Sequence, residues 1–212
     1  VIVGGVAGGA TAAARIRRLD EQAEIVVFER SGYISYANCG LPYYIGGVIE
    51  DAEELTLQTP ESFFARFRVQ MKVLHEVTAI HPDRKTVSVT NLQTGERFEE
   101  RYDKLLLSPG AKPTQPRFPG ADSDRLFTLR TVEDTFVIAD FIDREHPRTA
   151  TVVGAGFIGL EMAENLVERG VKVTVVQRPA HVMPTLDHDM AAPLQKHLPS
   201  HGNKPIPVSY TP

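Results

Sequence analysis

The feature that most constrains the fold is a strand, a glycine-rich turn and a helix that occur together twice. The first copy, "VIVGGVAGGATAAARIRRLDEQAEIVVFER", occupies residues 1–30, and the second, "ATVVGAGFIGLEMAENLVERGVKVTVVQR", occupies residues 150–178. In each copy a short Val/Ile strand leads through glycines into an amphipathic helix and then into a second β-rich run. This is the βαβ unit of a dinucleotide-binding fold, in which parallel strands need a crossover helix that covers one face of the sheet. We therefore predict an α/β chain with two Rossmann-like units of the FAD/NAD(P)-binding type.

The segments around the two copies predict four regions. Residues 69–90 and 96–111 have the pattern of short strands and a hairpin with "LQTGE" as its turn, and residues 130–148 have helical spacing that stops at "HPR". The final "PSHGNKPIPVSYTP" is rich in proline and has little periodicity. The expected regions are a FAD-binding domain (1–111), a linker and connecting helix (112–148), an incomplete NAD(P)-binding βαβ unit (149–198) and an irregular tail (199–212).

Composition narrows the classes of protein. A hydrophobic content of 42% and a charged content of 24% are ordinary for a soluble globular chain. A net charge of −4 gives no electrostatic reason to expect nucleic acid as a partner. No run approaches the ~18 apolar residues of a membrane helix. Because the chain starts on "VIV" without a Met or a basic segment, we expect no secretory signal and a cytoplasmic setting.

The first glycine loop is a candidate dinucleotide site. Gly4 begins the turn, and Gly9 permits close packing of the helix. Gly5 and Gly8 have no side chain and so leave space beside the backbone. Glu29 closes the second strand, where an acid is placed to accept a hydrogen bond from a ribose 2′-OH. The N-terminus of the helix would hold the pyrophosphate. The alternative is a tight turn whose glycines serve packing only.

The second loop matches the dinucleotide fingerprint with Gly154, Gly156 and Gly159. Its following strand ends in Gln177 and Arg178 rather than in an acid. Without a carboxylate for the 2′-OH, and with an arginine able to meet a 2′-phosphate, the site favours NADPH. Alternatively, Gln177 accepts a ribose hydroxyl and Arg178 is only solvated. Two loops imply two nucleotides, and a tightly held flavin with a diffusible nicotinamide is the economical pair.

The single cysteine, Cys39, lies in "SYANCGLPYY" directly after the first βαβ unit. One cysteine cannot form an internal disulfide. The stretch suits a helix N-terminus, where the dipole favours a thiolate, and it would lie close to the far end of the first dinucleotide. The alternative is a buried structural cysteine, against which the small and polar residues before Cys39 argue.

Two stretches, "GGVAGGATAAARIRRLDE" and "SYANCGLPYYIGG", resemble the coenzyme A-disulfide reductases and related NADH oxidases of the flavin- and nicotinamide-dependent disulfide reductase superfamily. The resemblance covers residues 1 to about 198. Many members carry a Cys-x4-Cys pair, but here Tyr44 occupies the second position, as in the single-cysteine branch. Oxidases and peroxidases of that branch carry a His in the first loop where this chain has Ala7, which favours disulfide reduction.

The resemblance also implies contacts for coenzyme A. On the first helix Thr11, Arg15 and Arg18 form one stripe, while we expect the neighbouring Ala12, Ile16 and Leu19 to face the sheet. An arginine stripe is usually a solvated face, but the family places coenzyme A along this edge. By resemblance the substrate-binding residues are Thr11, Arg15, Arg18, Ser35 and Asn38, and the redox-active residue is Cys39.

The implied cofactors are FAD and NAD(P)H. Phe157 stands where relatives often have a tyrosine that gates the nicotinamide pocket, and Glu161 resembles a glutamate close to the two rings. The candidate FAD residues are Gly4, Gly5, Val6, Ala7, Gly8, Gly9, Glu29, Arg30, Ser108, Pro109 and Gly110. The candidate NAD(P)H residues are Gly154, Gly156, Phe157, Ile158, Gly159, Glu161, Gln177 and Arg178.

Relatives of this family run roughly twice as long, with a further flavin-binding motif and a C-terminal dimerisation domain, so the resemblance implies a truncated member of a homodimeric enzyme. The expected activity is NAD(P)H-dependent reduction of coenzyme A disulfide, or of another small disulfide, through Cys39. Two alternatives stay open: an NADH oxidase that forms a Cys39 sulfenic acid, and a non-catalytic nucleotide-binding fragment or redox sensor.

Overall fold

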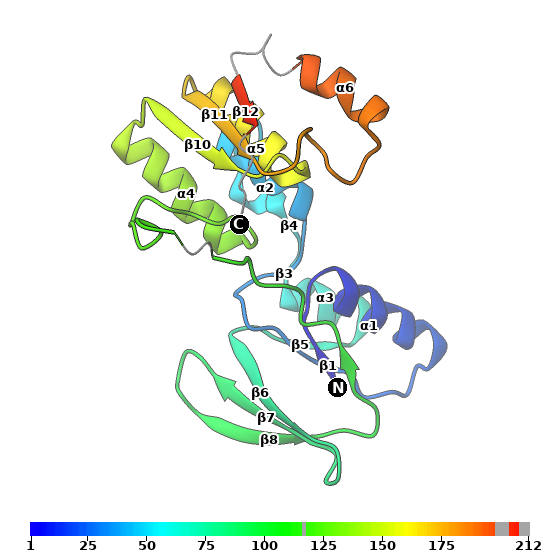
Figure 1. Cartoon of the computed structure of the whole chain (residues 1–212). Helices are drawn as coiled ribbons and strands as arrows, with labels where there is room; N and C mark the ends of the chain where they lie inside the picture. The colour runs from blue at the N-terminus through cyan, green and yellow to red at the C-terminus, as the bar shows by residue number, and fades with distance from the viewer. Residues whose placement is uncertain (116–117, 198–203, 208–212) are drawn as a thin grey trace. The chain divides into compact units, whose positions relative to one another are not determined.

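The computed structural model describes residues 1–115, 118–197 and 204–207, and the chain divides into two compact units (Figure 1). Unit 1 comprises Val1–Ala37 and Glu53–Thr114, and unit 2 comprises Asn38–Ala52 and Gln115–Pro212. The expected FAD-binding region, 1–111, differs from unit 1 in two respects: residues 38–52, with Cys39, cluster with the second half of the chain, and unit 1 continues to Thr114.

Unit 1 is built on a parallel sheet of strand order β5-β2-β1-β9. The helices α1 and α3 lie on one face of this sheet, and the antiparallel sheet β6-β7-β8 lies on the other (Figure 1). The elements are β1 (Ile2–Val3), α1 (Ala7–Leu19), β2 (Val26–Phe28), β3 (Ile34–Tyr36), β4 (Thr56–Gln58), α3 (Pro60–Phe67), β5 (Gln70–Lys72), β6 (His75–His81), β7 (Thr86–Asn91), β8 (Arg97–Arg101) and β9 (Leu106–Leu107).

The core of unit 1 explains this arrangement. Ala13 of α1 and Val27 of β2 are both fully buried, because alanines let the helix approach the sheet closely. On the other face Phe28 packs against Val87 and Val89 of β7. The predicted hairpin strands and the "LQTGE" turn are confirmed by β6, β7 and β8.

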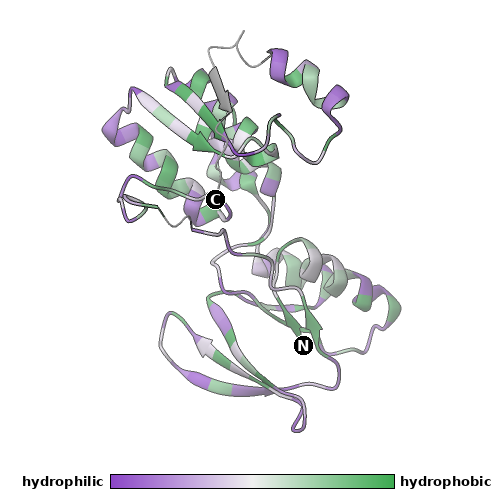
Figure 2. Ribbon diagram, viewed as in Figure 1, coloured by the Kyte–Doolittle hydropathy of each residue, from purple (hydrophilic) through white to green (hydrophobic). Residues whose placement is uncertain are grey.

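Unit 2 is built on the parallel strands β10 (Thr149–Val153), β11 (Lys172–Gln177) and β12 (Lys204–Pro207), in that order. Its helical elements are the short 3-10 turn η1 (Asn38–Gly40), α2 (Leu41–Gly46), α4 (Val132–Glu145), α5 (Phe157–Glu168) and α6 (His188–His197), and a further 3-10 turn, η2 (Ala52–Leu55), crosses the boundary between the units. Buried side chains of α2, α4, α5 and β11 share one core, and α4 alternates hydrophobic and hydrophilic residues along its length (Figure 2). The helix expected within residues 130–148 is thus confirmed as α4.

Two expectations need correction. Leu19 does not face the sheet: it is 69% exposed at the end of α1, because the buried stripe runs through Ala10, Ala13 and Ala14 instead. The proline-rich tail is not irregular throughout, because residues 204–207 form β12 and pair in parallel with β11. The edge of a sheet offers unpaired backbone N–H and C=O groups, so a segment can pair with it even where its own sequence lacks strand periodicity.

Candidate functional site

The first glycine loop lies where β1 turns into α1. The Gly4 amide donates to the Phe28 carbonyl at 2.8 Å, and the Gly5 amide donates to Glu29 Oε2 at 2.7 Å. A Cβ on Gly9 would lie 1.7 Å from the Gly4 carbonyl oxygen, so only glycine allows this approach of helix to strand. Glu29, the predicted ribose acceptor, therefore also ties the loop to the end of β2.

The second loop repeats this geometry in unit 2. The Gly154 amide donates to the Val176 carbonyl at 2.8 Å, and the Ala155 amide donates to Gln177 Oε1 at 2.9 Å. A Cβ on Gly159 would lie 1.9 Å from the Gly154 carbonyl oxygen. Gln177 thus holds the second loop as Glu29 holds the first, with a neutral amide in place of a carboxylate.

The N-termini of the two loop helices differ from those of the other long helices. Neither α1 nor α5 has a side-chain cap or an acidic residue in its first turn. By contrast, α3 and α4 each begin with a reciprocal capping box and carry acidic residues there. Uncapped N–H groups in a first turn without acidic residues are the arrangement that binds phosphate. Both loops therefore fit the pyrophosphate of a dinucleotide.

Two segments distant in sequence line the first loop. Ser108 follows β9, and its amide donates to the Val3 carbonyl at 2.8 Å. A Cβ on Gly4 would lie 1.9 Å from the Ser108 carbonyl oxygen, and one on Gly8 would lie 2.3 Å from Ser108 Oγ. Ser35, at a left-handed φ of 44°, donates its amide to the Gly5 carbonyl at 3.1 Å. The structure thus brings the predicted "SPGA" segment and Ser35 to the loop.

The remaining predicted residues of the first loop occupy its edges. Val6 is the N-cap residue of α1, whereas Ala7 and Gly8 are exposed in the first turn. Pro109 and Gly110 are exposed after Ser108. Arg30 is used elsewhere, because its Nε pairs with Glu76 Oε1 on β6 at 3.0 Å.

At the second loop the first turn of α5 is open to solvent. Phe157 is 63% exposed and Ile158 is 53% exposed, next to Gly156, at which a Cβ would meet nothing within 4 Å. Exposed apolar side chains beside an uncapped helix N-terminus can pack against a planar ring of a ligand. Burial, with a smaller contribution from the carboxylate of Glu164, raises the pKa of the Glu161 carboxyl above its ordinary value.

Cys39 is exposed in η1, one residue before Gly40, the N-cap residue of α2. The prediction that it precedes a helix is confirmed, and the alternative of a buried structural cysteine is wrong. Asn38 Oδ1 accepts a hydrogen bond from Arg130 Nη1 at 2.9 Å. Sequence reasoning missed Arg130, which lies 92 positions away and belongs to no motif. The position of Cys39 beside a flavin involves both units and stays a prediction.

On α1 the predicted stripe is solvent-facing. Thr11, Arg15 and Arg18 are exposed, and the described residues give neither arginine an ion-pair partner. Arg17 has a structural role instead: it donates to backbone carbonyls at the end of α1 and, 2.8 Å away, to that of Phe67 at the end of α3. Arg15 and Arg18 are therefore the cations of α1 that are available to a ligand.

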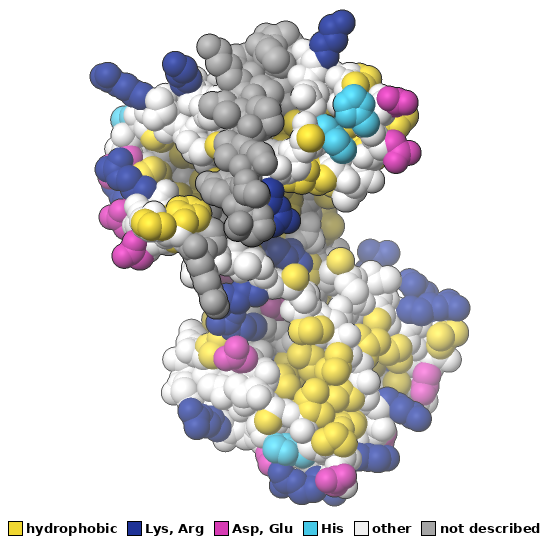
Figure 3. All heavy atoms as spheres, viewed as in Figure 1, with side chains coloured by type: hydrophobic (Ala, Val, Ile, Leu, Met, Phe, Trp, Pro, Cys, Tyr) yellow, Lys and Arg dark blue, Asp and Glu magenta, His cyan; other side chains and the backbone are white. Residues whose placement is uncertain are grey.

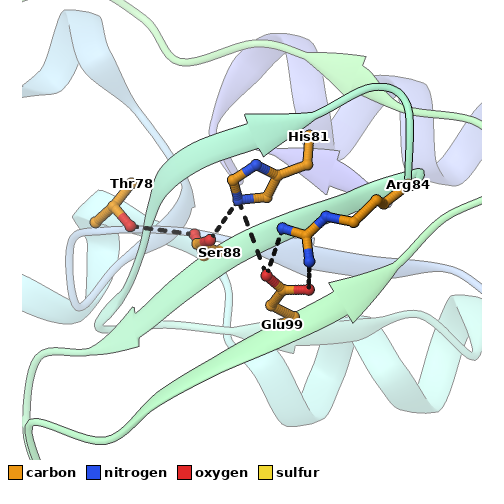
Figure 4. Close-up of polar contacts among 5 residues, drawn as sticks. All are labelled: Thr78, His81, Arg84, Ser88 and Glu99. Carbon is orange, nitrogen blue, oxygen red and sulfur yellow. Dashed lines mark hydrogen bonds and ion pairs between the residues drawn. The ribbon is translucent and has the colours of Figure 1, made fainter.

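A second polar cluster lies on the β6-β7-β8 sheet (Figure 4). His81 Nε2 lies 2.8 Å from Ser88 Oγ and 3.9 Å from Glu99 Oε1, and Glu99 also pairs with Arg84 at 2.9 Å. In a serine–histidine–acid triad the acid bonds the other ring nitrogen. Here one nitrogen faces both groups, and Arg84 neutralises the acid. The cluster braces the strands and is no nucleophilic site.

Metal-binding clusters and membrane-spanning helices are both absent from the part of the chain that the structure describes. It contains no group of three or more His, Cys, Asp or Glu side chains able to hold a metal ion. Within the same residues no helix is both long enough and apolar enough to cross a membrane. In the view of Figure 3, basic and acidic side chains are interspersed over the described part of this face.

Comparisons with known proteins agree with this geometry. Residues 1–204 match the family described as pyridine nucleotide-disulphide oxidoreductase. The chain is 48% identical over 198 residues to the coenzyme A disulfide reductase of Staphylococcus aureus (strain MRSA252), covering 93% of this chain and 44% of that protein. The chain thus spans less than half the length of the curated relatives it matches.

Two solved structures are similar. The reduced CoADR-RHD of Bacillus anthracis matches with a TM-score of 0.95 and 51% identity, covering 97% of this chain and 37% of that one. The water-forming NADH oxidase of Lactobacillus brevis, solved with NADH, matches with a TM-score of 0.89 and 33% identity, covering 97% and 45%. The predicted α/β fold of the FAD/NAD(P)-binding type is confirmed.

Proposed function

The chain belongs to the pyridine nucleotide-disulphide oxidoreductase family, and from this premise we propose that it reduces coenzyme A disulfide with electrons from NAD(P)H. The glycine loop of unit 1 holds FAD, the loop of unit 2 holds NAD(P)H, and Cys39 is the redox-active thiol. The observation that carries the proposal is the exposed, single cysteine in the turn before α2, in a chain with two uncapped glycine-loop helices.

Because the chain has one cysteine, the disulfide exchange at Cys39 must use a sulfur of the substrate as the second sulfur. The Cys39 thiolate attacks one sulfur of the substrate disulfide, so that a mixed disulfide forms and the other half leaves as a thiolate. Two electrons then cleave the mixed disulfide, which restores the Cys39 thiolate and releases the second thiol. FAD and the nicotinamide, when bound, supply these two electrons. No second protein cysteine is needed, because the substrate brings the partner sulfur.

We assign each nucleotide and the substrate its own set of residues. Gly4, Gly5, Gly8 and Gly9 with Ser108 surround the FAD loop, and Glu29 is the acceptor for its ribose. Thr11, Arg15 and Arg18 offer a hydroxyl and two unpaired cations to the phosphates of coenzyme A. Ser35 and Asn38 stay candidate contacts for its thiol-bearing arm.

The residues at the end of β11 favour NADPH over NADH. Gln177 is buried, and its two polar side-chain atoms bond the Ala155 amide and the His181 carbonyl. The position therefore has no carboxylate that could accept a hydrogen bond from a ribose 2′-OH. Arg178, the next residue, is exposed and can meet a 2′-phosphate. Arg178→Ala should weaken NADPH binding by about tenfold or more, since a charge-assisted contact is worth about 1.5–3 kcal/mol. NADH binding should hardly change, and exposed Arg148→Ala is the matched control.

The decisive experiment is intact mass spectrometry under non-reducing conditions after exposure to coenzyme A disulfide. We expect a single adduct with the mass of coenzyme A, lost on adding a reductant and absent in Cys39→Ser. An added oxygen on Cys39 and no adduct would instead support the NADH oxidase, for which the likeness to the Lactobacillus brevis enzyme speaks. A bare thiol that forms neither product would indicate a non-catalytic nucleotide-binding chain.

A further inference from the structure

Arg130 connects the start of α4 to the turn that carries Cys39. Its backbone amide donates to Asp134 Oδ2 at 2.9 Å, within the capping box that Thr131 and Asp134 form at the N-terminus of α4. Its Nη1 donates to Asn38 Oδ1, also at 2.9 Å. Because the capping box fixes the backbone from which the guanidinium extends, Arg130 can hold Asn38 in one place.

The contact also determines how the Asn38 amide is oriented. A guanidinium has N–H donors and no acceptor, so the atom that faces it must be the amide oxygen. The NH2 group then occupies the other branch of the amide, and Asn38 directly precedes Cys39 in the chain. Among the described residues, Asn38 Nδ2 has no hydrogen-bond acceptor. It is therefore available to donate to a ligand.

The other end of α2 is held independently. Arg169 of the α5 C-terminus donates through Nη1 to the Ile45 carbonyl at 3.1 Å, and it also pairs with Asp143 of α4. At Gly46 a Cβ would lie 2.0 Å from Asn165 Oδ1, so α2 and α5 meet there without room for a side chain. The far end of α2 is thus fixed by α4 and α5, and at its near end Arg130 contacts Asn38, the residue before Cys39.

We propose that Arg130 is a positioning residue, which orients Asn38 so that its Nδ2 donates a hydrogen bond to a carbonyl oxygen of the disulfide that reacts at Cys39. The substrate class that fits is a small disulfide with an amide carbonyl in its thiol-bearing arm. This inference rests on the proposed function, because coenzyme A disulfide is such a molecule. Arg130 acts through Asn38 and takes no part in the exchange of sulfur.

The test compares two disulfides as probes of Cys39, followed by intact mass: coenzyme A disulfide, which carries amide carbonyls, and 2-hydroxyethyl disulfide, which carries none. We expect Arg130→Met to slow exchange with coenzyme A disulfide about tenfold, the size of one lost hydrogen bond. Exchange with 2-hydroxyethyl disulfide should stay within about twofold. Arg130→Lys, which still donates, should restore most of the rate. Arg144→Met, which changes an exposed arginine of α4, should match the wild type.

A double substitution tests whether Arg130 acts through Asn38. Asn38→Ala should be as slow as Arg130→Met with coenzyme A disulfide, and Arg130→Met combined with Asn38→Ala should be no slower than Asn38→Ala alone. Additive losses, or equal slowing of both disulfides by Arg130→Met, would overturn the inference.

Failure of the inference can be told apart from failure of the proposed function. A wild type that prefers coenzyme A disulfide, with the preference intact in Arg130→Met, overturns only the inference. A wild type without any preference refutes the proposed substrate. Hydrogen exchange of the peptide spanning residues 38–44 then decides the positioning role: faster exchange in Arg130→Met, equal to that in Asn38→Ala, supports it, and unchanged exchange overturns it.

Discussion

Two glycines of the second loop should lose very different amounts of stability on substitution by alanine. In Gly159→Ala the new Cβ would lie 1.9 Å from the Gly154 carbonyl oxygen and 3.0 Å from its carbon, both part of the backbone. Helix α5 must move away from β10 to relieve this, which loosens the core that Ala163 and Leu166 share with β11. In Gly156→Ala the Cβ meets nothing within 4 Å, and its φ of −84° suits any residue.

The expected sizes follow from these distances. Overpacking against backbone costs about 3 kcal/mol for Gly159→Ala, which lowers the melting temperature of a unit of this size by roughly 12–24 °C. Gly156→Ala replaces a tolerated N-cap residue by a poor one and should cost less than about 1 kcal/mol, or about 4–8 °C. In the proposed NADPH site, a pyrophosphate would approach the backbone at Gly156, so the same change should weaken NADPH binding by about tenfold or more.

Thermal unfolding followed by circular dichroism and a fluorescence titration with NADPH measure both effects. Equal melting temperatures for the two variants would refute the claim that close helix–strand contact, and not the loop as such, demands Gly159. Unchanged NADPH affinity in Gly156→Ala would refute the placement of a nucleotide at this loop. Gly9→Ala offers an independent repeat in unit 1, where the Cβ would lie 1.7 Å from the Gly4 carbonyl oxygen.

Three further changes test how unit 2 is held together. Arg169→Met removes a donor from the Ile45 carbonyl and should reduce the free energy of unfolding by about 1–2 kcal/mol in a urea titration, whereas an unchanged midpoint would contradict this role. Thr131→Ala removes the cap of α4 and should lower the melting temperature by about 4–8 °C, with Thr131→Ser retaining most of the stability. Glu161 has a raised pKa, so the folded state is favoured while the carboxyl is protonated, and that contribution is lost as the pH rises through the raised value. Glu161→Gln should therefore gain stability relative to the wild type between about pH 4 and pH 7, and a difference that does not vary with pH would contradict the burial of this carboxyl.

Several features of the fold could be predicted because they depend on near neighbours in the chain. The glycines that begin and close each loop follow from steric limits within a few residues, and the same geometry at Gly9 and Gly159 bears this out. Helical and strand periodicity likewise identified α4 and the β6-β7-β8 sheet. The stripe of α1 was predicted less well. Its small alanines, not its larger Leu19, pack on the sheet, and periodicity alone cannot tell which of two adjacent stripes is buried.

The amino-acid sequence by itself determined that the chain contains two βαβ units, each with a glycine loop, and a lone thiol in the turn before a helix. Only the tertiary structure decided what supports these parts: that Glu29 and Gln177 each tie a loop amide, that Arg130 holds Asn38, and that Arg169 holds the end of α2. The two arginines lie 92 and 124 positions from their partners, and neither belongs to a motif. A hydrogen bond forms where packing brings a donor to an acceptor, and separation along the chain places no limit on that meeting.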